Sequence, residues 1–328
     1  LWETTSIENL MVMALKNREH LQAYDAAGPL AGLKFRIVDT LLRANSRTGS
    51  RRNIRNHYDV GNEFYQLWLD DGMTYSSGLF QDGDNDLTRA QSRKNARALS
   101  RLNDRDNVLE IGCGWGGFAE HAAEEGRTVT GVTISPSQHA WADSRLDGRA
   151  DIQMCDYRDI NGQYDNIVSI EMIEAVGHRY LPTFFSTCNN LLKPSGKMLI
   201  QAITIADQRY DRYRKQTDFI QRYIFPGGFL PSVEIMNKQI AKNTDLKVVG
   251  LTDIGLDYAI TLKHWSERLK AVSGELKGLG LDQQFYRMWQ FYFHYCEGGF
   301  RERLISTVHL VAEKPRYEDL GHAAVLNC

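Results

Sequence analysis

The feature of this 328-residue sequence that most restricts its fold is a regular alternation of short apolar runs with longer helical patterns, which begins at Val108. The apolar runs are VLEIG, TVTGVTI, NIVSI and KMLIQAITI, and the first three lead into segments with apolar residues at helical spacing. Short apolar runs that alternate with helices are typical of βαβ units. The pattern therefore predicts an α/β fold with a doubly wound, Rossmann-like parallel sheet.

The segments around this alternation are less regular. Residues 1–45 show helical spacing with a break at Gly28-Pro29, and the polar, basic run NSRTGSRRN after them predicts a linker. Residues 206–245 interrupt the alternation with an aromatic-rich stretch, which predicts an insertion near the functional site. Further strands are predicted at 258–262 and 306–312, with helices between them.

Charge and cysteine usage exclude several classes of protein. A formal net charge of -2 provides no global basic field, so we expect no nucleic-acid partner. The five cysteines lack CxxC or CxxH spacing, which argues against a metal site and against a disulfide framework, and favours a reducing cytoplasm. No run of 18 or more apolar residues is present, so any membrane contact is expected to be peripheral.

The stretch DNVLEIGCGWGGF predicts a strand, a glycine-rich turn and a helix whose free N–H groups can bind a ligand. Gly112, Gly114 and Gly117 satisfy G-x-G-x-x-G, a motif that by itself fits both a dinucleotide and S-adenosylmethionine. A tight turn without any ligand is the structural alternative.

Two details near this turn favour S-adenosylmethionine. Glu110 precedes the first glycine by two residues, where a carboxylate can reach the cofactor's amino group. The second strand ends in Gly131 to Ile134 without the acidic residue that grips the ribose of NAD. Thr133 and Gln138 can hydrogen-bond in its place, and Asp156 with Tyr157 after the third strand would suit an adenine.

Around this turn the sequence resembles the cyclopropane fatty acid synthase family, which includes the mycolic acid cyclopropane synthases. The resemblance runs over nearly all of residues 51–313. Its specific blocks are NHYDVGNEFYQLWLDDGMTYSSGLF, EIGCGWGG, GVTISPSQ, DYRD, SIEMIEAVG, YIFPGGFLPS, LDYAITLKHW and YCEGGFRER.

The resemblance implies a domain organisation and a fold. Residues 1–45 look like the last helices of a smaller N-terminal domain whose beginning is absent, and residues 46–328 look like the catalytic domain. The implied fold is the class I S-adenosylmethionine-dependent methyltransferase fold, with a helical insertion at 206–245 and a helical N-terminal remnant. Longer relatives also imply a homodimer.

The resemblance also implies a set of site residues. Family members bind the cofactor through the glycine turn and a tyrosine-serine pair, and hold a bicarbonate ion beside an active-site glutamate. For the cofactor, the matched or otherwise expected positions are Tyr75, Ser76, Glu110, Gly112, Gly114, Thr133, Ile134, Gln138, Asp156 and Tyr157. For catalysis they are Glu174, Tyr258, Ser77, Gln201 and Ile203.

Three positions depart from the family pattern. Ser77 stands in place of a cysteine, an exchange that leaves the backbone amide intact. Gln201 stands in place of a histidine and lacks its proton-accepting capacity near neutral pH, so bicarbonate binding and the final proton transfer stay open. Glu171 stands where relatives carry glycine, so of the two glutamates only Glu174 is expected to be catalytic.

The expected reaction is one-carbon transfer from S-adenosylmethionine to the cis double bond of an unsaturated phospholipid acyl chain. Methyl transfer leaves a carbocation, and the position of the proton that leaves next decides the product. Because Glu174, Tyr258 and Ile203 match, a cyclopropane is the leading prediction. The alternatives are a methyl-branched or methylene chain, transfer to a soluble small molecule, and a cofactor-binding protein without catalysis.

The aromatic and basic segment RYDRYRKQTDFIQRYIF, within residues 206–245, is the candidate membrane contact. A solvated helix face is the alternative. We expect a cytoplasmic protein that is peripheral to the inner membrane surface.

Overall fold

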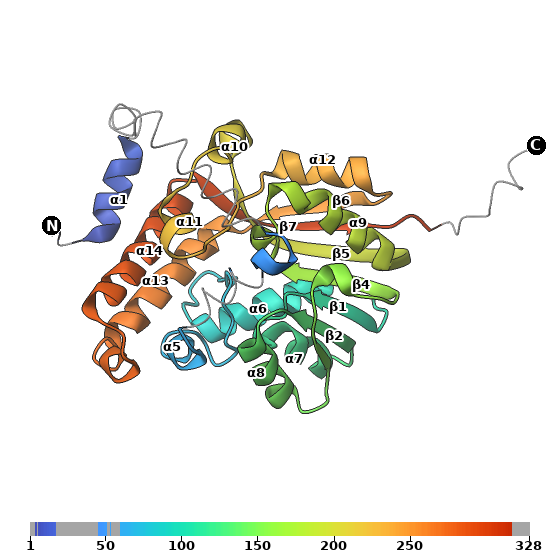
Figure 1. Ribbon diagram of the computed structural model, residues 1–328, viewed down its shortest axis with the longest axis horizontal. Coiled ribbons are helices and arrows are strands. Elements are labelled where there is room, and N and C mark those ends of the chain that lie inside the picture. The colour runs from blue at the N-terminus through green and yellow to red at the C-terminus, as the bar shows by residue number, and fades with distance from the viewer. Residues whose placement is uncertain (1–3, 5, 18–44, 51–52, 54–59, 317–328) are drawn as a thin grey trace, which may run out of the picture.

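A computed structural model describes residues 4, 6–17, 45–50, 53 and 60–316. Its centre is a seven-stranded sheet with the order β3-β2-β1-β4-β5-β7-β6, flanked by helices (Figure 1). The first five strands in this order are parallel, and β7 is antiparallel to both of its neighbours. The strands are β1 (Asn107–Ile111), β2 (Thr128–Thr133), β3 (Asp151–Met154), β4 (Tyr164–Ile170), β5 (Leu192–Ile205), β6 (Lys247–Asp253) and β7 (Ile305–Glu313).

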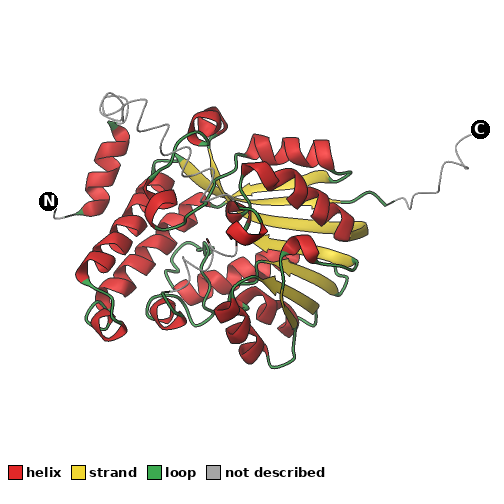
Figure 2. Ribbon diagram, in the orientation of Figure 1, coloured by secondary structure: helices red, strands yellow, loops and turns green. Residues whose placement is uncertain are grey.

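Helices cover both faces of this sheet (Figure 2). One core cluster joins the sheet to α9 (Leu181–Leu191) and α12 (Val233–Asn243). Another joins it to α6 (Leu87–Ser100), α7 (Gly117–Glu124) and α8 (Pro136–Leu146). Both faces of the central strands are therefore buried, which explains why their sequences are continuous apolar runs.

A third core cluster lies beyond the carboxyl ends of the parallel strands and is built from aromatic side chains. It joins α5 (Asn62–Gln66), α13 (Gly255–Ala271) and α14 (Gln283–Arg301), and α1 (Ile7–Lys16) packs on α14. The short helices α10 (Asp207–Tyr213) and α11 (Phe219–Tyr223) lie between β5 and α12 in the sequence. Single 3-10 turns are η1 (Tyr157–Asp159), η2 (Ile173–Ala175), η3 (His178–Tyr180) and η4 (Leu276–Leu279).

The predicted class of fold is confirmed, including the alternation from β1 to β5 and the strand at 306–312, which is β7. The strand predicted at 258–262 is wrong. These residues lie inside the 17-residue helix α13, where Tyr258, Leu262, Trp265 and Leu269 are buried at helical spacing. The sequence interpretation missed β6, an edge strand without a single fully buried residue, so its apolar signal is weak.

The run 45–53 is not simply a linker. Residues 47–50 are helical, and the side chains of Asn45, Ser50 and Asn53 are buried. Of the predicted helices in residues 1–45, α1 is present, and the segment 18–44 lies outside the described residues. Within the described ranges, no helix is both long and apolar enough to cross a membrane.

Candidate active site

A cavity of about 380 Å³ lies at the carboxyl ends of the parallel strands, the usual place for a ligand in a doubly wound sheet. It is lined by every site residue that the sequence predicts except Ser77 and Gln201, which are fully buried behind it. One continuous cavity thus brings together the glycine turn after β1 and the two glutamates after β4.

The glycine turn after β1 is shaped to admit a ligand. Gly112 and Gly114 both have positive φ, at 84° and 54°. A Cβ on Gly112 would lie 2.6 Å from Cγ of Met172, so only glycine fits there. A Cβ on Gly114 would meet no atom of the described chain within 4 Å, which shows that the turn opens into the cavity.

Glu110 supplies an acceptor next to this turn. Its side chain is buried, and its Oε2 has no hydrogen-bond partner among the residues that the structure describes. Burial raises the pKa of this carboxyl to about 8, against the opposing charge of Lys94. A cationic amino group of a ligand would satisfy the orphaned oxygen and favour its ionised form.

The residues at the ends of β2 and β3 form one wall of the part of the cavity that is expected to hold the cofactor. The Thr133 hydroxyl donates to Oε1 of Gln138 over 3.1 Å, so these two side chains form one polar unit. Both oxygens of Asp156 accept hydrogen bonds from Arg158, and the Tyr157 hydroxyl has no partner within the described chain. Together with Glu110 and Gly114, these groups fit S-adenosylmethionine.

The loop that carries Tyr75, Ser76 and Ser77 closes the cavity from the side of α6. Lys94 of α6 is buried and donates from Nζ to the Ser76 hydroxyl over 3.2 Å, and Gln91 donates to the Ser76 carbonyl over 2.8 Å. Burial lowers the pKa of Lys94 to about 8, although three nearby carboxylates, Glu171 first, oppose that shift. Helix α6 therefore fixes both the position of this loop and a buried cation near the site.

The carboxylate of Glu171 is held by three donors from three different elements. The backbone N–H of Ser77 and Nε2 of Gln201 both donate to its Oε1, over 2.9 and 2.8 Å. The hydroxyl of Tyr258 in α13 donates to its Oε2 over 2.7 Å. Burial raises the pKa of Glu171, while these three hydrogen bonds and the charge of Lys94 act in the opposite direction.

A histidine stands behind Gln201. His309 is its partner in the antiparallel pairing of β5 and β7, and the His309 ring nitrogen Nε2 lies 2.8 Å from Oε1 of Gln201. Because that amide oxygen can only accept, Nε2 carries the proton, and burial lowers the pKa of His309 to about 3. A neutral histidine thus fixes the Gln201 amide with its NH₂ group toward Glu171.

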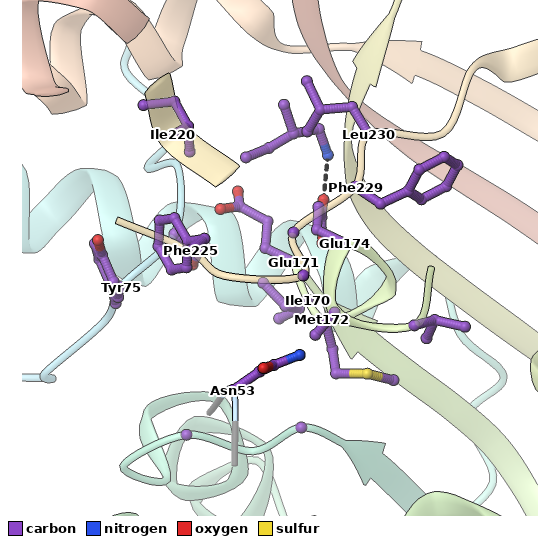
Figure 3. Close-up of a pocket in the computed structure, with 18 of the residues that line it drawn as sticks. Asn53, Tyr75, Ile170, Glu171, Met172, Glu174, Ile220, Phe225, Phe229 and Leu230 are labelled. Carbon is purple, nitrogen blue, oxygen red and sulfur yellow. Dashed lines mark hydrogen bonds between the residues drawn. The ribbon is translucent and has the colours of Figure 1, made fainter. Parts of the chain in front are cut away.

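Glu174 lies beside Glu171 and differs from it in its hydrogen bonds (Figure 3). Its Oε1 accepts from the backbone N–H of Ile203 over 2.5 Å, and its Oε2 has no partner in the described part of the chain. Burial first, and then the charge of Glu171, raise the pKa of Glu174 to about 8. Near neutral pH, Glu174 is therefore mainly the protonated member of the pair.

This arrangement does not fit a separate bicarbonate ion among the residues expected to hold it. The donors from Ser77, Gln201 and Tyr258 all point at the Glu171 carboxylate, which has the planar, two-oxygen shape of the expected anion. The side chain of Glu171 occupies the position where those three donors meet.

The rest of the cavity is mainly apolar. Phe225 stacks on Tyr75 with ring centroids 6.1 Å apart, and the Tyr75 hydroxyl donates to that of Tyr292. Figure 3 shows the two carboxylates among Phe225, Ile220 and Leu230. Further apolar lining comes from Ile203, Ile205, Leu262, Phe300, Leu304 and Ile305. A long hydrocarbon group has a matching surface next to the carboxylates.

The sequence interpretation missed three contributors: Glu171 as the best-connected carboxylate, Lys94 and His309. For Glu171 and His309 a signal exists, because Glu171 directly follows the largely apolar residues 167–170 and His309 interrupts the apolar run 308–312. Lys94 lies in a helix rich in basic residues, and nothing in its local sequence marks it as buried.

Comparison with known proteins identifies the family. Residues 45–310 match the family model described as mycolic acid cyclopropane synthetase, which is most of the chain. The chain belongs to this family. It is therefore a relative of S-adenosylmethionine-dependent methyltransferases that modify lipids, as the sequence resemblance implied.

Two curated relatives in this family carry different activities in their names. Tuberculostearic acid methyltransferase UfaA1 of Mycobacterium tuberculosis is 39% identical over 83% of this chain and 67% of its own length. Cyclopropane-fatty-acyl-phospholipid synthase of Escherichia coli is 38% identical over 78% of this chain and 66% of its own length. The chain thus spans about two thirds of the length of these relatives, and identity alone does not separate methylation from ring formation.

A solved structure of the family supports the fold and the cofactor. The mycolic acid cyclopropane synthase CmaA1, in complex with SAH and CTAB, has a TM-score of 0.75 at 29% identity, covering 80% of this chain and 98% of that one. The present chain, like CmaA1, has the class I methyltransferase fold, and it uses S-adenosylmethionine.

Proposed function

We propose that this family member transfers a methyl group to the cis double bond of an unsaturated phospholipid acyl chain and releases an uncyclised product, either a methyl-branched alkene or a chain with a methylene branch. One observation carries the proposal. A single cavity joins the cofactor residues to an apolar wall, and two carboxylates lie between them. S-adenosylmethionine supplies an electrophilic methyl group when bound, and the apolar wall would align the alkene with it and exclude water.

Aromatic side chains near the carboxylates support a reaction that passes through a cation. Tyr75 and Phe225 present stacked rings to the cavity, and Tyr258 is buried against Phe300 with ring centroids 4.6 Å apart. The faces of such rings attract a positive charge in a dry site. These residues would stabilise the cation that methyl transfer leaves on the neighbouring carbon of the acyl chain.

The uncyclised product is favoured over the cyclopropane for a structural reason. The sequence favours ring closure because the residues expected around bicarbonate are present, yet Tyr258 and Ser77 donate to Glu171 instead.

The membrane surface is the proposed source of the substrate. Ile220 and Phe225 line the cavity, whereas Arg222 and Tyr223 on the same segment are exposed, Tyr223 by 52%. Basic side chains with an exposed aromatic ring suit the headgroup region of an anionic bilayer. This segment supports a peripheral membrane location, and the family resemblance supports a homodimer.

The test is the structure of the product. The full chain is incubated with S-adenosylmethionine and vesicles of unsaturated phospholipid, and the extracted fatty acids are examined by NMR. Cyclopropane and methylene products both add one carbon and two hydrogens, so mass alone does not separate them. Methyl-branched or methylene signals support the proposal, and ring protons would overturn the choice of product. Methyl incorporation into soluble small molecules but never into lipid would overturn the substrate.

A further inference from the structure

We propose that the carboxylate of Glu171 is this enzyme's built-in proton acceptor, so that the reaction proceeds without bicarbonate. This inference deepens the proposed function and rests on it, because a proton acceptor is needed only if methyl transfer leaves a cation on the acyl chain. It holds for an open or a cyclic product, since both require the loss of one proton.

The geometry of Glu171 is the first support. Its carboxylate lines the cavity, and its donors come from the loop before α6, from β5 and from α13, so it is fixed from three directions. All three are N–H or O–H groups, which stabilise an ionised carboxylate. Glu174 lacks such a set of donors on both oxygens, since its Oε1 accepts from the Ile203 amide and its Oε2 has no partner among the described residues.

The backbone at Glu171 is the second support. Glu171 has φ of 50°, in the left-handed region that favours glycine, although it bears a long side chain. A non-glycine residue there is strained, and such conformations cluster at functional sites. The backbone N–H of Glu171 donates to the carbonyl of Gln201 over 2.8 Å, which anchors this conformation to β5.

The third support is that the donors are ordered independently of any ion. Ser77 is fixed by its neighbours, because Gly78 donates to Thr261 and Phe80 donates to Asp257 of α13. Gln201 is fixed by His309. The site is thus preorganised around a carboxylate that belongs to the chain.

The loss of the proton from the acyl cation requires only Glu171 and water. After methyl transfer, one C–H bond of the cationic acyl chain breaks, and its electron pair forms the π bond of an open product or the closing carbon–carbon bond of a cyclopropane. The proton goes to an oxygen of Glu171, which becomes a neutral carboxylic acid, and it then passes to water as the product leaves. Because both Glu171 oxygens already accept hydrogen bonds, the carboxylate is a weaker nucleophile toward the cation than a free one.

The experiment compares wild type with Glu171→Gly and Glu171→Gln in carbon dioxide-free buffer and after bicarbonate is added. Glycine suits the backbone conformation and leaves an open position between the three donors, whereas glutamine fills that position without a basic oxygen. The matched control is Glu234→Gln, which removes an exposed carboxylate on α12 outside the cavity. Methyl transfer to unsaturated phospholipid vesicles is the readout.

We expect added bicarbonate to leave the methyl-transfer rates of wild type and Glu234→Gln unchanged. Glu171→Gly and Glu171→Gln should each lose at least about tenfold in methyl transfer. Added bicarbonate should restore part of the rate in Glu171→Gly only. Wild type that requires bicarbonate, or a Glu171→Gly variant as active as wild type without it, would overturn the inference.

A binding measurement separates this inference from the proposed function. In NMR with ¹³C-labelled bicarbonate and no lipid, the Glu171→Gly protein should broaden the bicarbonate signal, and wild type should not. Broadening by wild type that is lost in Tyr258→Phe would show that an ion binds beside Glu171 and would overturn the inference. If wild type transfers no methyl group to any lipid, the proposed function fails, whatever this measurement gives.

Discussion

The two ends of the cavity differ in how their polar groups are satisfied. At the cofactor end, Glu110 Oε2 and the Tyr157 hydroxyl have no partner among the described residues, and Gly114 faces open space. At the end formed by β4 and β5, the donors of Ser77 and Tyr258 are already bound to a side chain. The first end is built to receive a ligand that comes and goes. At the second end the donors expected to hold an anion already bind Glu171, and Glu174 Oε2 is the carboxylate oxygen there without a partner in the described part of the chain.

Substitution of Gly114 by alanine should disrupt the cofactor end most strongly. A methyl group there projects into the cavity, so we expect the affinity for S-adenosylmethionine to fall at least about 30-fold, or about 2 kcal/mol, from a micromolar dissociation constant. Calorimetry measures this. Gly126→Ala is the matched control, because Gly126 also has positive φ and open space but lies outside the cavity. Equal affinity losses in the two variants would mean that Gly114 does not contact the cofactor.

Glu174→Gln should impair the reaction at the end of the cavity formed by β4 and β5 without weakening binding at the cofactor end. We expect methyl transfer to fall at least about tenfold, or about 1.4 kcal/mol in the barrier, with cofactor affinity near that of wild type. Transfer kinetics and calorimetry on the same preparation check this. A parallel loss of binding would show that Glu174 acts on the cofactor or on the fold, and that the two ends are not independent.

The raised pKa of Glu174 should also appear in the stability of the free protein. The folded protein keeps this carboxyl protonated up to about pH 8, whereas the unfolded chain releases the proton near pH 4.5, so stability decreases as pH rises between these values. The Glu174→Gln side chain cannot titrate, so the free energy of unfolding of this variant should fall by about 1 kcal/mol less than that of wild type across this window. The difference is small because the side chain faces a cavity that screens it. Urea unfolding at several pH values measures this. Parallel pH curves for both proteins would contradict the shift.

Tyr258→Phe should produce the smallest effect and directly test the hydrogen bonds to Glu171. Loss of a donor to the ionised Glu171 raises the pKa of that carboxyl further, so the acidic limb of the rate–pH profile should move up by about half a unit, or about 0.7 kcal/mol. Tyr164→Phe, whose hydroxyl bonds to the carbonyl of Asn161 far from the cavity, should leave the limb in place. A limb that does not move would show that Glu171 is not the titrating base.

The two ends also differ in how far the sequence predicts them. Glu110 lies in β1 and the glycine turn directly follows it, so motif and periodicity predict their place at the cavity, whereas Tyr75 and Ser76 were expected only from the family resemblance. The Glu171 hydrogen bonds join residues 30, 87 and 94 positions apart in the chain, and these distances carry no local pattern. The interpretation of 258–262 as a strand failed for a similar reason, since this five-residue segment did not reveal the 17-residue helix around it.

The left-handed backbone at Glu171 has a genetic consequence. Glycine and glutamate codons that end in A or G differ by one base, and glycine is the residue that this conformation suits best. A chain with glycine at this position could therefore acquire the carboxylate by a single mutation, with little change in the path of its backbone. Under the proposed mechanism, a single base change would therefore separate an enzyme that requires bicarbonate from one that does not. Either enzyme could evolve from the other without passing through an unfolded protein.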